Sequence, residues 1–194
     1  GPLVARARQA SVSLPGGCAI GARPIDQHLK CLEAMGVKII LNQGYVEAKA
    51  KRLHGADITL DLPTVTGTEN LMMAATLAKG TTRIINAAQE PEVTDLARFL
   101  TAMGAEIDGI GTDVLTIRGV KALTPASYTI MSDRIEAGTY LAAAAITRGQ
   151  VTITNAPVPE MAAVLEKCHE AGARLSTAGD RIIVEPGGSL TGVD

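Results

Sequence analysis

The sequence is poor in the residues that build aromatic surfaces and covalent cross-links. Its 194 residues include no Trp, one Phe and three Tyr, so a base-stacking platform for nucleic acid is not expected. The net charge of −2, from 18 Lys and Arg against 20 Asp and Glu, likewise favours neither a nucleic-acid nor an anionic-membrane partner. Three cysteines without metal-ligand spacing argue against a disulfide framework and suit a reducing, cytoplasmic compartment.

Long apolar runs are absent as well. The longest, Tyr140 to Ile146, is far shorter than the roughly 20 residues that span a bilayer. No leader of charged, apolar and small residues opens the chain, so no secretory signal is expected. The composition, 46% hydrophobic and 20% charged, is typical of a soluble globular protein with one ample domain or two smaller ones.

A repeated helix is the strongest pattern that is present. Three segments, Ile25 to Gly36, Val93 to Gly104 and Met161 to Gly172, have apolar residues at helical spacing on one stripe. Their closing glycines are equally spaced along the chain. A glycine at this position supplies a left-handed C-cap without a Cβ penalty. The pattern therefore predicts three copies of one helix.

A second helix type alternates with the first, over Thr68 to Lys79 and Glu136 to Arg148, and a strand-like run follows each copy. Each helix of the first type precedes two strand-like runs around a turn. The repeating unit therefore reads βαβαββ, which predicts an α/β (α+β) fold with a right-handed parallel crossover in each unit and an antiparallel hairpin at its end.

The first copy of this unit is incomplete. A strand is predicted over Ala10 to Leu14, and only a stub, Leu3 to Arg6, stands where the preceding helix would end. About two and a half units are therefore expected, as an interior piece of a longer protein. We place a domain boundary close to Ile130, which divides the chain into domains 1–130 and 131–194.

The loop before the first repeated helix, Leu14 to Asp26, differs from its copies. Three glycines allow a ligand to approach its main chain. Pro24 suits the first helical position, so Arg23 would lie just outside a helix N-terminus, where N–H groups and a guanidinium together favour a phosphate or carboxylate. Cys18 lies in the same loop, where a thiol is exposed and its ionisation is tuned. A loop cysteine without function is the alternative interpretation.

The other two cysteines and the three histidines are not interpreted as catalytic or metal-binding. Cys168 takes a core position of the repeat, and Cys31 lies on a variable flank with no suggested role. His28 falls on the apolar stripe of its helix, which predicts a packing role. The three histidines lack the arrangement of a zinc site or a catalytic triad.

Acidic residues near helix starts are interpreted as structural. Glu90 and Glu92 flank Pro91, where carboxylates favour the helix dipole, and Asp133 precedes the helix that contains Glu136, where it predicts a cap. Neither a dinucleotide fingerprint nor a phosphate-loop motif occurs. No metal and no organic cofactor are predicted.

Several segments carry a resemblance to a known family. The loop from Leu14 to Asp26 is similar to the active-site loop of the UDP-N-acetylglucosamine 1-carboxyvinyltransferase family of enolpyruvyl transferases, and the likeness extends through 64–70, 74–81, 86–92 and 132–139. That family is built from six βαβαββ units in two three-unit domains, an arrangement described as an inside-out barrel. The resemblance implies that this chain contributes about two and a half of the six.

The resemblance also implies a reaction and roles. The enolpyruvyl group of phosphoenolpyruvate would pass to the 3-hydroxyl of UDP-N-acetylglucosamine with release of phosphate, the first committed step of peptidoglycan synthesis. Cys18 would be the proton donor, and the thiol that fosfomycin alkylates, on a mobile lid, and Arg23 would stabilise phosphate. The positions matched to segments that contact substrate are Arg23, Pro24, Ile25, Asp26, Gln27, Thr64 and Val65.

This sequence departs from the family at two places. Leu62-Pro63 stands where some relatives carry Lys-Val, and Gln89 where relatives often have Arg, so one charged nucleotide contact and an ionic network are in question. Further family groups, including the presumed base for the sugar hydroxyl, lie outside the chain, so negligible turnover is expected from it alone. The alternatives are another enzyme of enolpyruvyl transferase type and a non-catalytic paralogue that binds a UDP-sugar.

Overall fold

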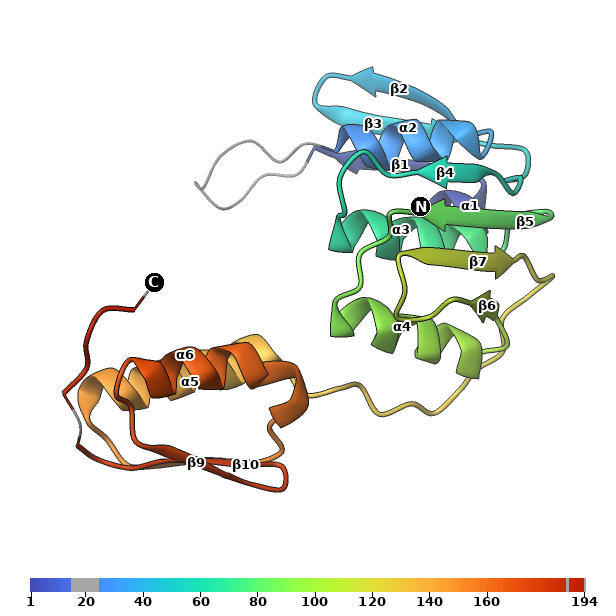
Figure 1. Cartoon of the computed structure of the whole chain (residues 1–194). Coiled ribbons are helices and arrows are strands. Elements are labelled where there is room, and N and C mark those ends of the chain that lie inside the picture. The colour runs from blue at the N-terminus through green and yellow to red at the C-terminus, as the bar shows by residue number, and fades with distance from the viewer. Residues whose placement is uncertain (15–24, 188, 194) are drawn as a thin grey trace. The chain divides into compact units, whose positions relative to one another are not determined.

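The computed structural model describes residues 1–14, 25–187 and 189–193 (Figure 1). Contacts within it divide the chain into two compact units, Gly1–Thr129 and Ile130–Asp194, which are taken in turn. Whether 131–194 opens a second domain of a longer protein stays a prediction. The mixture of helices and strands agrees with the predicted α/β class.

Unit 1 contains four helices and seven strands among its described residues. In chain order they are α1 (Pro2–Ala7), β1 (Gln9–Ser13), α2 (Asp26–Ala34), β2 (Lys38–Asn42), β3 (Tyr45–Lys49), β4 (Asp57–Thr59), α3 (Val65–Ala75), β5 (Thr81–Ile85), α4 (Pro91–Ala102), β6 (Glu106–Asp108) and β7 (Val114–Arg118).

The strands of unit 1 form two sheets, in the orders β1-β3-β2 and β4-β5-β7-β6. β4 and β5 are parallel and joined through α3, whereas the hairpins β2–β3 and β6–β7 are antiparallel. The second sheet therefore confirms the predicted crossover and terminal hairpin. Its polar face carries two exposed cross-strand ion pairs, Arg83–Asp57 at 3.8 Å and Arg118–Asp108 at 2.7 Å.

The core of unit 1 lies between these sheets and their helices. α3 is buried along most of its length and packs against α1, α2, α4 and β5 (Figure 1). Its fully buried residues include Leu71 and Met72, and Ile84 of β5 and Ile117 of β7 belong to the same core. Cys31 is also buried in this core, and the absence of a functional role for it stays a prediction.

The closing glycines of the repeated helices have the predicted conformation. Gly36, Gly104 and Gly172 have φ angles of +89°, +97° and +93°, values that L-residues with a Cβ rarely adopt. Each donates its N–H back into the last helical turn. The repeat in the sequence therefore corresponds to a repeated helix end in the structure.

Unit 2 begins with α5 (Arg134–Thr147). It continues with β8 (Val151–Ile153), a 3-10 turn over Val158–Met161, α6 (Ala162–Glu170), β9 (Leu175–Ala178) and β10 (Arg181–Val184). Its sheet has the order β8-β10-β9, and both pairings are antiparallel. Leu141, Met161 and Ile182 are fully buried in the core of this unit.

The parallel crossover predicted for every unit is wrong for this copy, because residues 119–133 form no strand. Within unit 1, two residues of this segment contact α4 and the turn after it instead. Thr124 donates its N–H to the carbonyl of Met103 at 2.8 Å, and Tyr128 stacks on Phe99 with ring centroids 5.1 Å apart. These contacts hold the segment in an irregular form.

Candidate functional site at the starts of α2 and α3

Three predicted site residues, Cys18, Arg23 and Pro24, fall in 15–24, outside the described residues. Ile25 follows as the N-cap of α2, and the exposed Asp26 is its first helical residue. The helical position predicted for Pro24 lies outside the described residues. The carboxylate of Asp26 in the first turn suits the positive end of the helix dipole.

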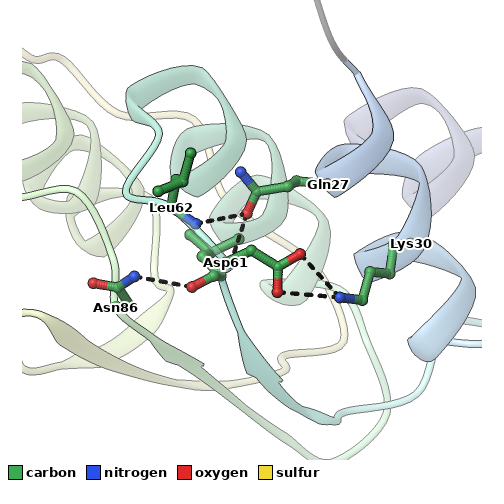
Figure 2. A network of polar contacts seen from close by, with 6 residues as sticks. Gln27, Lys30, Asp61, Leu62 and Asn86 are labelled. Atoms are coloured by element: carbon green, nitrogen blue, oxygen red, sulfur yellow. Dashed lines mark hydrogen bonds and ion pairs between the residues drawn. The ribbon is translucent and has the colours of Figure 1, made fainter.

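Gln27 joins the start of α2 to the loop between β4 and α3 (Figure 2). Its Oε1 accepts hydrogen bonds from the backbone N–H groups of Asp61 at 2.8 Å and Leu62 at 3.3 Å. One turn further along α2, Nζ of Lys30 lies 3.0 and 3.2 Å from the two carboxylate oxygens of Asp61. One helix thus holds this loop through both a side-chain amide and an exposed ion pair.

The same loop is held from its other side by Asn86, which follows β5. Nδ2 of Asn86 donates to the carbonyl of Leu60 at 2.9 Å (Figure 2). Asn86 has a φ of +62°, a left-handed conformation that Asn tolerates better than most residues. Asn155, at the corresponding place after β8 in the next repeat, has a φ of +55°, so the repeat preserves this turn.

The second predicted segment begins α3. Thr64 is extended and caps the helix, its Oγ1 accepting the N–H of Gly67 at 3.3 Å, and half-buried Val65 is the first helical residue. The prediction that this helix begins at Thr68 is wrong by one turn. Thr68 is instead fully buried, and its Oγ1 accepts the N–H of Ala88 at 3.0 Å, which fixes the loop before α4.

The predicted segments 25–27 and 64–65 are therefore brought together through Gln27 and the loop that it binds. The Lys30–Asp61 ion pair and the Asn86 contact were not predicted. The signal for Asn86 was available, because an Asn directly after a β-branched strand favours a left-handed turn. No pattern marks Lys30 and Asp61, which are 31 residues apart.

Carboxylates lie near one another on α3 and at the start of α4. Burial raises the pKa of Glu69, and the charges of Glu92 and Glu90 raise it further. Glu90 is the N-cap residue of α4, but its side chain makes no capping hydrogen bond, whereas Glu92 lies in the first turn, where its carboxylate favours the helix dipole as predicted. Asp133, in contrast, caps α5 as predicted, accepting the N–H groups of Ile135 at 2.7 Å and Glu136 at 3.2 Å.

His28 is half-buried on the inner side of α2. Its Nδ1 lies 3.3 Å from Nδ2 of Asn70 in α3, so the imidazole links the two helices. Burial lowers its pKa. This agrees with the packing role predicted for it. In the part of the chain that the structure describes, no three His, Cys, Asp or Glu residues gather as metal ligands would, and no described helix is both long and apolar enough to cross a membrane.

The βαβαββ order from β4 to β7 and the glycine-capped helices agree with the predicted repeated α/β fold. The chain belongs to the EPSP synthase (3-phosphoshikimate 1-carboxyvinyltransferase) family, whose model matches residues 1–194. The solved structures it resembles include the enolpyruvyl transferase NikO from Streptomyces tendae, with a TM-score of 0.78 at 24% identity over 95% of this chain and 45% of that one. An EPSP synthase from Acinetobacter baumannii has a TM-score of 0.63 at 22% identity over 94% of this chain and 44% of that one. These likenesses support the predicted enolpyruvyl transferase fold; they leave the number of repeats untested.

The curated relatives are more similar in sequence. A UDP-N-acetylglucosamine 1-carboxyvinyltransferase from Sorangium cellulosum is 55% identical over the whole of this chain and 46% of its own length. One from Desulfatibacillum aliphaticivorans is 54% identical, again over the whole chain and 47% of its own length. The chain therefore spans about half the length of the curated relatives it matches.

Proposed function

We propose that the full-length protein transfers the enolpyruvyl group of phosphoenolpyruvate to the 3-hydroxyl of UDP-N-acetylglucosamine. The observation that carries this proposal is the 55% identity, sustained over all of this chain, to a relative of that name. The solved structures, at 24% identity or less, support the fold alone. In the cell the reaction would serve peptidoglycan synthesis in the cytoplasm.

The proposed chemistry has two stages. The sugar hydroxyl gives its proton to a base outside this chain and its oxygen adds to C2 of phosphoenolpyruvate, while an acid delivers a proton to C3, which becomes a methyl group. A proton then leaves that methyl group as the C2–O bond to phosphate breaks, which restores the vinyl group and releases phosphate. We assign the acid to the thiol of Cys18, and the guanidinium of Arg23 to the phosphate, where charge-assisted hydrogen bonds stabilise the leaving group.

The starts of α2 and α3 would form the nucleotide side of the site. We assign contacts with the nucleotide to Pro24, Ile25, Asp26 and Gln27, and to Thr64 and Val65. Because Oε1 of Gln27 is already engaged by the backbone of 61–62, its amide nitrogen is the group left to meet a ligand oxygen. Leu62 brings no charge to the nucleotide side of the site. The Lys30–Asp61 ion pair and Gln27 would order the loop between β4 and α3 instead.

Phosphate release tests the proposal on the full-length protein. Release from phosphoenolpyruvate should require UDP-N-acetylglucosamine, and Cys18→Ser should lower kcat at least about a hundredfold while nucleotide binding persists. Cys168→Ser is the matched control and should leave kcat unchanged. Release without the sugar nucleotide would exclude this acceptor, and binding without any release would identify a non-catalytic paralogue.

Fosfomycin provides an independent test of the thiol. Mass spectrometry should locate the adduct on Cys18 and find none on Cys31, which is 4% exposed. An adduct on Cys31 or Cys168 with Cys18 unmodified would overturn the assignment of the acid.

A further inference from the structure

A strongly basic groove lies at one end of the first sheet of unit 1. Two adjoining cavities, of about 430 and 530 Å³, share Arg8 and Arg52 in their walls. Among the described residues no Asp or Glu lines either cavity, although the chain as a whole has more acids than bases. The basic side chains that line the two cavities are Arg6, Arg8, Lys38, Lys49, Lys51, Arg52, His54 and Lys121.

The register of the sheet concentrates this charge. Lys38 of β2 lies directly opposite Lys49 of β3, and like charges facing each other across strands destabilise a sheet. The structure gives neither lysine an ion-pair partner among the described residues. On an ordinary solvated face an acid would stand opposite one of them, as Asp57 does opposite Arg83.

Backbone hydrogen bonds fix residues 50–54, which form part of the groove wall. Ala50 donates its N–H to the carbonyl of Arg8 at 2.9 Å, and His54 donates to Met35 at 3.0 Å. Lys79 donates to the carbonyl of Leu53 at 2.8 Å, and Leu53 is buried. Three hydrogen bonds to different parts of the chain therefore fix the backbone of residues 50–54. Lys51 and Arg52, which line the groove, are thus attached to an ordered backbone.

The size of the two cavities and the residues that line them indicate the class of ligand. Cavities of a few hundred Å³ fit small molecules, and the described linings of both cavities contain no Phe, Tyr or Trp on which a nucleobase could stack. Arginine forks suit phosphate oxygens, and two arginines at the junction of two cavities suit neighbouring phosphates. We propose that this groove binds a small oligophosphate, a ligand with two or three linked phosphate groups.

Binding of inorganic tripolyphosphate to the full-length protein, measured by calorimetry at low salt, tests the proposal. Arg8→Gln with Arg52→Gln should weaken binding at least about tenfold. Arg83→Gln with Arg118→Gln removes the same charge from an exposed sheet face and should change affinity less than about twofold. Equal weakening by both pairs would mean attraction to overall charge, and insensitivity to both would mean binding elsewhere; either result overturns the proposal, as does the absence of binding.

A stability measurement on a lysine variant tests the proposal without changing either arginine. Lys49→Gln should raise the melting temperature of the ligand-free protein, because it removes the Lys38–Lys49 repulsion, and should reduce the rise that tripolyphosphate produces. A fall in the ligand-free melting temperature would contradict the repulsion. Displacement of tripolyphosphate by a short single-stranded oligonucleotide at far lower concentration would assign the groove to nucleic acid and overturn the small-ligand proposal.

Discussion

α3 and α5 take the same place in successive repeats, yet the structure surrounds them differently. α3 is buried along most of its length, with Leu71 and Met72 fully enclosed. α5 packs against β8, β10 and the 3-10 turn, and leaves Ile135 and Ile146 exposed, the latter by 74%. Similar helical patterns thus reach different burial because burial depends on how many neighbours a helix acquires.

The largest expected effect tests this difference directly. Leu71→Ala and Leu141→Ala each empty a fully buried position, but the site in α3 is enclosed by helices as well as strands and collapses less. We expect losses of about 4 kcal/mol and about 2–3 kcal/mol, respectively. Hydrogen exchange of the β5 and β8 amides measures each opening free energy. Equal losses would show that the two cores are equally rigid.

A second comparison concerns the third residue of the repeated segments that begin at Ile25 and Val93. Gln27 of α2 binds the backbone of 61–62, and Asp95, at the equivalent position of α4, accepts the hydroxyl proton of Tyr128 at 2.8 Å. Each residue holds the segment 33 to 35 residues downstream, where the chain approaches the next helix of the second type. The position therefore serves as a tether in both copies, although its residue type differs.

Gln27→Ala and Asp95→Ala should each cost about 1–2 kcal/mol, because each leaves hydrogen-bonding groups without their partner. Lys30→Ala, which breaks only the exposed ion pair to Asp61, should cost less than about 1 kcal/mol. Denaturant unfolding followed by circular dichroism gives the three values. A cost for Lys30→Ala at or above that for Gln27→Ala would show that the ion pair, not the amide, holds the loop.

The two helix caps differ in a smaller way. Asp133 accepts two N–H groups at the start of α5, whereas Thr64 accepts one at the start of α3. Alanine should therefore cost about 1–2 kcal/mol at Asp133 and about 0.5–1 kcal/mol at Thr64. Replacement by Asn at Asp133 and by Ser at Thr64 should restore most of each loss. Thermal unfolding of the variants ranks the costs, and the reverse order would contradict the cap geometry.

The smallest effect is electrostatic. Burial and two neighbouring carboxylates raise the pKa of Glu69, so the folded chain keeps this proton to higher pH than the unfolded chain does. Stability is then lost as pH rises from the ordinary carboxyl range through the raised pKa. Glu69→Gln should stabilise the protein at pH 7 by less than about 1 kcal/mol, since solvent screens the charges, and change nothing near pH 3. Denaturant unfolding at the two pH values measures this, and an equal stabilisation at both would exclude the cause.

Much of the fold followed from short-range rules. The repeated helices, their closing glycines and the strand pairs of each hairpin were predicted because helical spacing, left-handed glycine and alternating strands are local properties. The failures lie where distant segments compete for the chain. Residues 119–133 form no strand, and Tyr128 and Thr124 bind α4 and the turn after it instead.

The sequence by itself determined the periodic elements and, through whole-chain similarity, the family, because both are written in residue order. Only the tertiary structure decided that Gln27 and Lys30 would hold the loop before α3 and that lysines of two strands would face each other beside Arg8 and Arg52. Those neighbours are set by sheet register and helix packing, which bring together residues that no local pattern relates.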